Sequence, residues 1–559
     1  MVFDPLARAC QLLDKINLNI PLPAAIFQPV RKNSLGIDFS DRKFREEFQQ
    51  NIAKIDITKW HAEPIVANKK TTKDKGLKVS SPQNSSLVIG DLIEATYDDV
   101  NLALNNAKDA KLAWSQTNVA QRAECILRFA DLLEKNMPTL EVMACLEAGK
   151  TWHDGIAEIR EAIDFCRYYA SIALDLQAKP KELRGYTGEL NELSYHPRGI
   201  VLCISPWNFP LAIFTGQVVA ALVTGNCVIA KPAEQTPHIA YFAVKLMLEA
   251  GIPEGVIQLL PGVGETIGAK LVASRNINAV IFTGGTKTAE IINKTLATRG
   301  GEIVPFIAET GGQNAMIVDS SALLQQVVVD VLNSAFGSAG QRCSALRVLY
   351  IQEEIYLPFV ELLKGAMAEL VIGDPCWLNT DIGPVIDKES LKSIQDHVAL
   401  MVKNYELIYQ CKLNSECKDG YFMPPTAIAI DNISALKKEV FGPVLHVIKY
   451  KRKNLDEVIG EINNTGYGLT LGIHSRINET VDYIRARVHV GNCYVNRNII
   501  GAVVGLQPFG GEGLSGTGPK AGGPNYLLKL CHERTFTVDT TAAGGNASLM
   551  SLTDDLLNE

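Results

Sequence analysis

Residues 199–231 read GIVLCISPWNFPLAIFTGQVVAALVTGNCVIAK. Two strand-like apolar runs, 199–205 and 227–231, flank an apolar stretch of helical length at 211–224. The same alternation continues in further helical segments and strand-like runs at 239–250, 256–260, 266–274 and 279–283. A β-α-β-α order of this kind predicts a parallel sheet covered by helices, and the expected fold class is α/β.

The flanking sequence extends this organisation in both directions. Alanines and leucines at three-to-four spacing predict helices over about 100–135 and 140–174. Alternating apolar and polar residues around two glycines predict a β-hairpin at 182–196. A second α/β unit is expected from 315 to about 464, and the acidic, small-residue-rich stretch 535–559 is expected to be a tail.

Bulk properties exclude several classes of protein. The chain has 559 residues, 47% of them hydrophobic, which suits two or three packed domains. A formal net charge of −7 without a dense basic run disfavours nucleic-acid binding. No apolar stretch reaches the roughly 18 residues of a membrane span, and the N-terminus does not resemble a signal peptide. The twelve cysteines show no Cys-x-x-Cys spacing, which indicates reduced thiols and a cytoplasmic location. The sequence also contains no His-x-x-x-His motif, so it gives no indication of a metal site.

Two glycine-containing motifs carry little weight alone. The stretch 261–268 follows a strand-like run and opens a helix, but Ile267 stands where a G-x-G-x-x-G motif has its third glycine. The triplet Gly149-Lys150-Thr151 is similar to the end of a phosphate loop, but Ala144 replaces the first glycine. We interpret this triplet as a helix detail rather than a phosphate-binding loop.

Six segments are far more specific when they are taken together. They are Pro206-Trp207-Asn208-Phe209-Pro210, Lys231-Pro232-Ala233-Glu234, Glu309-Thr310-Gly311-Gly312, Gly340-Gln341-Arg342-Cys343, Glu439-Val440-Phe441-Gly442-Pro443 and Pro508-Phe509-Gly510-Gly511. In order and spacing they resemble the aldehyde dehydrogenase superfamily, over roughly residues 60–530.

The resemblance implies a fold and a domain division. The expected fold has a Rossmann-like NAD-binding domain, an α/β catalytic domain and a small β oligomerisation flap, so a homo-oligomer is expected. The expected segments are a linker and helix at 1–45, the NAD-binding domain at 46–308 with the flap hairpin at 182–197, the catalytic domain at 309–480, a return to the core with the substrate anchor loop and oligomerisation strand at 481–534, and the tail at 535–559.

The resemblance also assigns three catalytic roles. Cys343 would be the nucleophile, because the approach Phe336-Gly337-Ser338-Ala339-Gly340 is small enough to admit substrate and nicotinamide. Glu309 would be the general base that activates Cys343 or the hydrolytic water. The amide of Asn208 and the backbone N–H of Cys343 would stabilise the oxyanion. The other cysteines are interpreted as core residues.

The cofactor implied is NAD⁺. Lys231 and Glu234 would hold the adenosine ribose, and the Glu234 carboxylate would repel the 2′-phosphate of NADP⁺. Gly285 would begin a helix facing the pyrophosphate, although many members of the family have Ser there. Glu439 and Phe441 would place the nicotinamide ribose. The remaining expected cofactor contacts are Ile204, Pro206, Trp207, Gly264, Gly268, Thr283 and Gly284.

The substrate expected is L-glutamate γ-semialdehyde, from a resemblance to the Δ1-pyrroline-5-carboxylate dehydrogenase branch. Ser344, Gly501 and Ala502 would anchor its α-carboxylate, although some members of the branch have Ser in place of Ala502. Phe209 and Phe509 would enclose its aliphatic part. Glu158 would face the α-ammonium, and Arg342 is a further expected substrate contact.

Stretches outside the site, 31–38, 516–524 and 540–546, resemble the C-terminal half of bifunctional proline utilisation A proteins. Those proteins fuse a flavin-dependent proline dehydrogenase ahead of the aldehyde dehydrogenase. The chain therefore resembles either a shortened form of such a protein or a natural single-function relative. We favour the shortened form, in which the initiator Met is added and residues 4–9 belong to a linker helix.

Three alternatives remain open. The chain could be a structural or binding protein on this scaffold, which intact Cys343, Glu309 and Asn208 disfavour. It could be the part of a proline-utilisation protein that acts as a transcriptional repressor, which the acidic net charge disfavours. It could also oxidise another carboxylated aldehyde, such as succinate semialdehyde, for which an Arg in the substrate pocket is expected.

Overall fold

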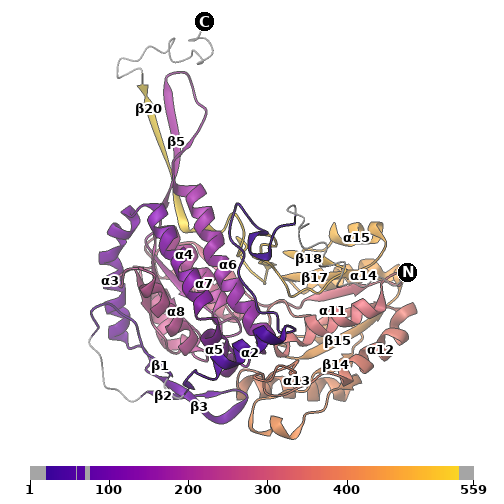
Figure 1. Ribbon diagram of the computed structural model, residues 1–559. Coiled ribbons are helices and arrows are strands. Elements are labelled where there is room, and N and C mark those ends of the chain that lie inside the picture. Colours follow the sequence, from indigo (N-terminus) through magenta and orange to yellow (C-terminus); the bar gives the residue numbers. More distant parts are fainter. Residues whose placement is uncertain (1–19, 58–59, 70–75, 541–559) are drawn as a thin grey trace, which may run out of the picture.

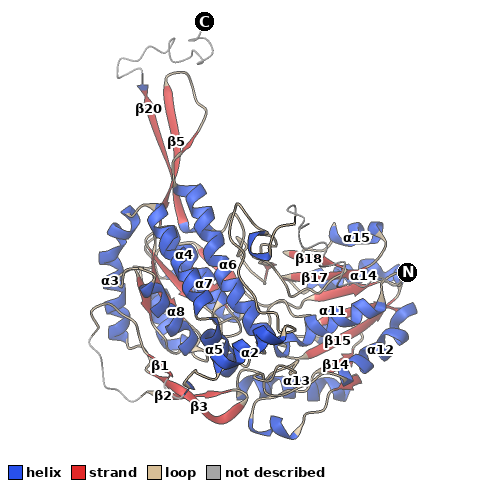
Figure 2. Ribbon diagram, in the orientation of Figure 1, coloured by secondary structure: helices blue, strands red, loops and turns tan. Residues whose placement is uncertain are grey.

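The computed structural model describes residues 20–57, 60–69 and 76–540. Its body consists of two sheets with their covering helices, set side by side (Figure 1). A long β ribbon projects from one of these two halves, as the strand colouring of Figure 2 makes clear. The expected linker helix at residues 4–9 lies outside the described residues.

The first half is built on a parallel sheet of five strands in the order β10-β9-β6-β7-β8. The order places the first strand of the unit at the centre and runs outward in both directions, as in a Rossmann fold. Its strands are β6 (Ile200–Ile204), β7 (Cys227–Lys231), β8 (Ile257–Leu259), β9 (Ala279–Thr283) and β10 (Phe306–Glu309). The bounds of β7 and β9 coincide with those expected from the sequence.

Helices cover both faces of this sheet (Figure 1). They are α3 (Tyr97–Gln116), α4 (Val119–Lys135), α5 (Met137–Ala148), α6 (Trp152–Gln177), α7 (Ala212–Val223), α8 (Pro237–Glu249), α9 (Ala269–Ala273) and α10 (Thr286–Thr298). The short π-helical turn η3 (Gly264–Gly268) precedes α9.

Each long helical pattern expected from the sequence is in fact two helices. The pattern at 100–135 breaks between α3 and α4, where the side chain of Asn118 accepts a hydrogen bond from Ala120 N–H and caps α4. The pattern at 140–174 breaks at Gly149, which ends α5 in the left-handed region at φ 66°. Thr151 then caps α6 through its side chain. Gly149 and Thr151 thus cap two successive helices, so the triplet is a helix detail, as the sequence indicated.

The second half contains a seven-stranded sheet in the order β13-β14-β15-β12-β11-β17-β18, in which only β13 is antiparallel. Its strands are β11 (Ala315–Val318), β12 (Val348–Gln352), β13 (Glu406–Gln410), β14 (Thr426–Ala429), β15 (Val444–Tyr450), β17 (Thr470–His474) and β18 (Asn492–Val495). Its helices are α11 (Leu324–Phe336), α12 (Glu353–Ala368), α13 (Lys388–Asn404), α14 (Leu455–Asn464) and α15 (Asn478–Arg485). The sheet therefore continues past the ends expected at 464 and 480, because β17 pairs with β11 and β18 pairs with β17.

The projecting ribbon pairs β5 (Glu189–Pro197) with β20 (Cys531–Asp539) on one side and with β4 (Lys181–Glu182) on the other. The hairpin predicted at 182–196 is thus present as β4 and β5. The tail expected from residue 535 begins later, because the backbone as far as Asp539 is hydrogen-bonded to β5. The rest of that expected tail, residues 541–559, lies outside the described residues.

Smaller elements complete the described chain. They are the sheet β1 (Trp60–Ala62), β3 (Asn84–Leu92) and β2 (Leu77–Ser81), the pair β16 (Tyr467–Gly468) and β19 (Glu512–Gly513), helix α2 (Arg42–Ile52), and the short turns η1 (Pro23–Ala25), η4 (Gly337–Gly340), η5 (Ser415–Asp419), η6 (Ile433–Ala435), η7 (Arg452–Asn454) and η8 (Leu527–Leu530).

Each half has its own hydrophobic core. The first core also includes Val504, Tyr526, Leu527 and Leu530 from the far end of the sequence, so this half is assembled from two separate parts of the chain. Among the described helices, none combines the length and the apolarity needed to cross a bilayer.

Candidate active site

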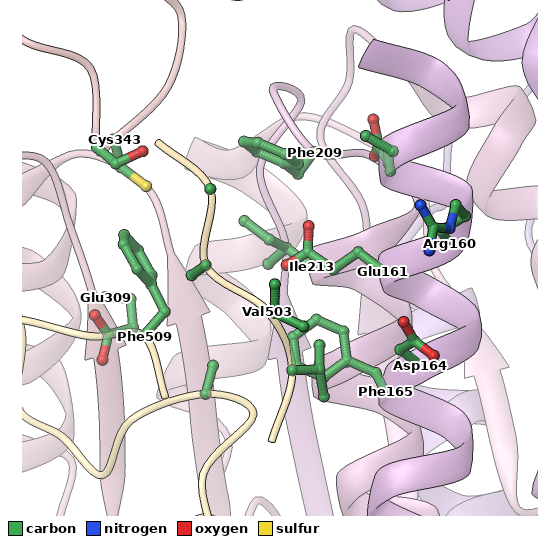
Figure 3. Close-up of a pocket in the computed structure, with 18 of the residues that line it drawn as sticks. Arg160, Glu161, Asp164, Phe165, Phe209, Ile213, Glu309, Cys343, Val503 and Phe509 are labelled. Carbon is green, nitrogen blue, oxygen red and sulfur yellow. The ribbon is translucent and has the colours of Figure 1, made fainter. Parts of the chain in front are cut away.

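A cavity of about 460 Å³ lies between the two halves of the molecule. Helix α6, the loop of residues 500–506 and the turn that carries Cys343 contribute to its wall. Figure 3 shows the Cys343 sulfur directed into this space, with Phe209 and Phe509 beside it and α6 on the far side. The structure thus brings the expected nucleophile and the expected substrate residues to one cavity.

The turn before Cys343 has an uncommon backbone. Ser338 and Ala339, in η4, have φ values of 54° and 53°, a region that non-glycine residues seldom occupy. Gly340 follows at φ 66°, and a Cβ there would collide with the carbonyl of Gly442. The close approach of these two chain segments requires glycine at position 340.

Two buried side chains hold the turn in place. Arg347 donates to the carbonyls of Gly340 at 2.7 Å and Arg342 at 3.0 Å. Asn314 donates to the carbonyl of Cys343 at 2.6 Å. With these carbonyls fixed, the backbone N–H of Cys343 donates no hydrogen bond to any described residue and is available to an oxyanion.

The Cys343 thiol is held in its neutral form. Burial raises its pKa to about 12, and the nearby carboxylates of Glu439 and Glu309 act in the same direction. A thiol with this pKa is protonated at neutral pH, so it needs a base before it can act as a nucleophile.

Glu309 ends strand β10 and lines the same cavity. Its Oε2 accepts a hydrogen bond from Gly511 N–H at 3.2 Å, whereas its buried Oε1 has no hydrogen-bond partner among the described residues. Burial raises the pKa of Glu309 well above the usual range, and the Gly511 N–H and Lys520 offset only part of that shift. A carboxylate with a raised pKa and a free oxygen can accept a proton at neutral pH.

Asn208 lies between β6 and α7. Its Nδ2 donates to the carbonyl of Gln341 at 3.1 Å, two residues before the nucleophile. An amide nitrogen carries two hydrogens, so one donor remains for a ligand beside Cys343.

The expected cofactor residues gather at the carboxyl ends of three parallel strands. Ile204 ends β6, Lys231 ends β7 and Thr283 ends β9, and Ile204 pairs directly with Lys231. This edge is where open α/β sheets bind dinucleotides. Pro206 follows β6, and the Trp207 ring there makes an edge contact with Phe441, with centroids 5.6 Å apart.

The local chemistry at this edge fits an adenine dinucleotide. Gly285 is the N-cap of α10 and provides no side-chain cap, and a Cβ at Gly285 or Gly264 would meet no atom within 4 Å. An uncapped helix N-terminus beside open space can accept a pyrophosphate. Lys231 Nζ contacts Glu234 Oε2 at 3.1 Å, and a Cβ at Gly268 would lie 4.0 Å from Lys231 Cε.

Two other expected cofactor residues have defined partners. Gly284 N–H donates to the carbonyl of Glu309 at 3.1 Å, which joins the ends of β9 and β10. Glu439 Oε1 accepts from Arg347 at 3.1 Å, and burial raises the pKa of its carboxyl group.

All seven expected substrate residues line the cavity: Glu158, Phe209, Arg342, Ser344, Gly501, Ala502 and Phe509. The backbone N–H groups of Gly501 and Ala502 donate no hydrogen bond to any described residue. Arg342 is already paired, because its Nη2 lies 2.6 Å from Asp154 Oδ1.

Among these seven residues, Glu158 has part of its carboxylate engaged by the protein itself. Its Oε1 accepts from Leu211 N–H at 2.8 Å and Ala212 N–H at 3.2 Å, and its Oε2 lies 3.1 Å from Lys150 Nζ. Its side chain has no exposed surface. Glu158 thus binds the N-terminus of α7 through Oε1, whereas its Oε2 faces Lys150 and accepts no hydrogen bond from any described residue. Its role toward a substrate ammonium stays a prediction.

Sequence reasoning missed Glu161, one turn further along α6. Figure 3 shows its carboxylate reaching from α6 into the cavity. It has no hydrogen bond or ion pair among the described residues, and burial together with the charge of Glu158 raises its pKa to about 7. Within the sequence only its position on the cavity-facing side of α6 distinguishes it, and that requires the helix register.

Comparisons with known proteins agree with this geometry. The model of the aldehyde dehydrogenase family matches residues 68–536. A bifunctional protein PutA of Klebsiella aerogenes is 48% identical over 92% of this chain and 39% of its own length. A 1-pyrroline-5-carboxylate dehydrogenase of Geobacillus sp. strain WCH70 is 36% identical over 91% of this chain and 99% of its own length.

Solved structures show the same relationships. The 1-pyrroline-5-carboxylate dehydrogenase from Thermus with bound NAD superposes with a TM-score of 0.86 at 33% identity, covering 91% of this chain and 99% of that one. Proline utilization A of Bradyrhizobium japonicum gives a TM-score of 0.86 at 45% identity, covering 94% of this chain and 50% of that one. The chain spans about two fifths of the length of the PutA relatives that it matches.

Proposed function

We propose a function for this chain on the basis that it belongs to the aldehyde dehydrogenase family. It oxidises L-glutamate γ-semialdehyde to L-glutamate with NAD⁺, which is the second step of proline catabolism. The observation that carries this substrate is the pairing of two complementary groups in one cavity. The free N–H groups of Gly501 and Ala502 suit a carboxylate, and the unpaired carboxylate of Glu161 suits an ammonium. An amino acid presents both groups on one carbon.

The first half of the reaction begins with proton removal from the Cys343 thiol, for which Glu309 is the base. The thiolate attacks the aldehyde carbon and forms a tetrahedral thiohemiacetal anion. The Asn208 amide and the Cys343 N–H donate to its oxygen, and the loss of one such donor costs on the order of 10²–10³ in rate. Lys231 and Glu234 would hold NAD⁺ at the edge of the five-stranded sheet, and this cofactor would supply the hydride acceptor.

The second half releases the product from a thioester on Cys343. Once Glu309 has released to solvent the proton that it took from Cys343, it takes a proton from water. The resulting hydroxide attacks the thioester carbonyl, the Cys343 sulfur leaves as a thiolate, and Glu309 returns the proton to it. Both halves need Glu309 unprotonated, and the raised pKa of its carboxyl group makes it a stronger base than an exposed carboxylate.

Cofactor choice follows from Glu234. Its carboxylate lies beside Lys231 at the end of β7, where the adenosine ribose of a Rossmann-type cofactor binds. A 2′-phosphate at that place would be repelled by Glu234, which supports NAD⁺ rather than NADP⁺. Glu439 and Phe441 would place the nicotinamide ribose.

A dehydrogenase for succinate semialdehyde is the second candidate. That substrate has a carboxylate and no ammonium, so it would use a free cationic residue and have no use for Glu161. Two arginines line the cavity: Arg342 is engaged by Asp154, whereas Arg160 donates only to the Ser34 hydroxyl, at 3.3 Å, among the described residues. The preference for the amino-acid substrate therefore rests on the unpaired carboxylate of Glu161.

Three further features belong to the proposal. The ribbon of β5 and β20 would form the contact between subunits of a homo-oligomer, because it projects from the body with its backbone edge exposed. The absence of disulfides among the cysteines of the described residues supports a cytoplasmic location. Similarity to PutA supports a flavin-dependent proline dehydrogenase, on the same polypeptide or another, as the source of the substrate.

Steady-state kinetics with a panel of aldehydes and both nucleotides test the proposal. L-Glutamate γ-semialdehyde should give the highest kcat/KM, above succinate semialdehyde and propanal, and NAD⁺ should exceed NADP⁺. A higher kcat/KM with succinate semialdehyde would replace the proposed substrate with the second candidate.

A further inference from the structure

Part of the cavity wall comes from outside both halves of the fold. Ile26, Phe27 and Asn33, in the segment before α2, line the cavity together with Val503 and Val504. The sequence suggested only a linker over this part of the chain. Its contribution to the wall raises the question of what holds it there.

Arg31 provides the main attachment. Its guanidinium is buried, with 6% of the residue exposed. One nitrogen donates to Asp164 Oδ1 of α6 at 2.5 Å, and the other donates to the carbonyl of Val504 at 3.0 Å. The guanidinium also lies 4.1 Å from the centroid of the Phe27 ring. One side chain therefore joins α6, the loop of residues 500–506 and the N-terminal segment.

Asp164 is satisfied by this segment alone among the described residues. Besides Arg31, it accepts hydrogen bonds from the backbone N–H of Ser34 at 3.1 Å and from its hydroxyl at 2.9 Å. The Arg31 charge is neutralised by Asp164, so Arg31 acts on a ligand through geometry rather than through its electric field.

The position of Asp164 on α6 gives this junction a consequence for the substrate. Asp164 lies three residues after Glu161, so both project from the same face of the helix. Val504 lies two residues after Ala502 in the loop. Arg31 thus spans the two structures that carry the ammonium-binding and carboxylate-binding groups.

We propose that Arg31 is a positioning residue that sets the distance between the carboxylate-binding N–H groups of Gly501 and Ala502 and the carboxylate of Glu161. An amino-acid end can occupy both only if that distance is held, whereas an aldehyde with no charged groups makes no such demand. Arg31 therefore determines specificity for the amino-acid end of the substrate. This inference rests on the proposed function, since it takes that substrate as given.

The test compares Arg31→Met, which keeps the aliphatic stem and removes both donors, with Lys32→Met. Lys32 is the adjacent cation, its side chain is 47% exposed, and it pairs with Glu134 on the surface. For Arg31→Met we expect kcat/KM with L-glutamate γ-semialdehyde to fall at least about tenfold, mainly through KM, and kcat/KM with propanal to stay within about twofold. Lys32→Met should match the wild type with both aldehydes.

Loss of Arg31 leaves the buried Asp164 without its cation, which can destabilise the fold. The double variant Arg31→Met with Asp164→Asn removes both charges and should show the same selective loss. Arg31→Lys, which can keep the ion pair but not both hydrogen bonds, should fall between Arg31→Met and the wild type. Equal losses with both aldehydes in the single and double variants would assign Arg31 a structural role only and overturn the inference.

Binding of L-glutamate, measured by calorimetry, supplies a readout other than turnover. Arg31→Met should weaken it at least about tenfold, and an unchanged affinity would overturn the inference. If the proposed function itself is wrong, the result differs from the failure of this inference. The wild type would then show no preference in kcat/KM for L-glutamate γ-semialdehyde over propanal. A wild-type preference that Arg31→Met retains would contradict only the role of Arg31.

Discussion

The guanidinium of Arg347 donates to Glu439 Oε1 at 3.1 Å while it holds the carbonyls of Gly340 and Arg342. Arg347 is 1% exposed, and its guanidinium also lies 5.3 Å from the centroid of the Phe441 ring. One buried cation therefore fixes both the turn of the nucleophile and the residues expected to place the nicotinamide ribose. The proposed nucleophile and the proposed site of the nicotinamide would share this support.

Arg347→Lys should impair both functions together, because an ammonium cannot reproduce the planar fork of donors. We expect kcat to fall by at least about tenfold and the Kd of NAD⁺ to rise, with a lower Tm because a buried network is disrupted. Kinetics, nucleotide titration and thermal melting check this, with Arg485→Lys on the exposed face of α15 as the control. A change in kcat with unchanged NAD⁺ affinity would separate the two functions.

Cys343→Ala should abolish NADH formation, because no other cysteine of the described residues lines the cavity where the covalent intermediate would form. NAD⁺ binding should be nearly intact, since the sheet edge that would hold the cofactor does not include this sulfur. Cys493→Ala, at a second half-buried cysteine, should keep wild-type activity and serves as the control. Retention of even about a tenth of the wild-type kcat would remove Cys343 as the nucleophile.

Glu234→Ala should shrink the ratio of kcat/KM between NAD⁺ and NADP⁺. The substitution removes the carboxylate that would repel a 2′-phosphate and frees Lys231, whose ammonium it now contacts at 3.1 Å. Kinetics with both nucleotides measure the ratio. If it stays at the wild-type value, the discrimination lies elsewhere in the sheet edge.

Ser344→Ala and Ala502→Pro should each reduce kcat/KM much more with L-glutamate γ-semialdehyde than with propanal. The first removes a hydroxyl beside the nucleophile and the second removes one of the free N–H groups in the loop. Loss of an anchor at the remote end of a substrate degrades orientation at the reacting carbon. Equal losses with both aldehydes would mean that these small residues serve loop packing alone.

The affinity for L-glutamate should depend on pH through Glu161, whose pKa is raised to about 7. Below that pH the carboxyl group is neutral, and above it the anion attracts the α-ammonium, so the Kd of L-glutamate should fall as pH rises from 6 to 8. Glu161→Gln should bind more weakly at pH 8 and lose this dependence. Calorimetry across the range provides the measurement, and a persistent dependence in Glu161→Gln would assign the titration to another group.

Strands were more readable in the sequence than helix ends. Strands β7 and β9 are short apolar runs between clear turn residues, so their bounds could be predicted. The breaks at Asn118 and Gly149 were missed because capping interrupts a helix without interrupting its apolar pattern.

The site divides in a similar way. Cys343, Glu309 and Asn208 stand in motifs that are continuous in the sequence, and the cavity brings Cys343 and Glu309 together. Glu158 and Glu161 lie on one helix and differ only in what their carboxylates meet. Arg31 contacts Asp164 across 133 residues of sequence, a separation that no local pattern can encode.

The pairing of β20 with β5, together with the burial of Leu527 and Leu530 in the first core, bears on how the protein is made. A ribosome completes most of the five-stranded sheet and its helices long before it releases the segment that seals them. The seven-stranded half lies between these two parts in the sequence and can mature while the earlier half is still open. We therefore expect nascent chains that stop short of β20 to expose apolar surface on the first half and to need protection by chaperones. Once β20 has been synthesised and has paired with β5, that surface should be covered.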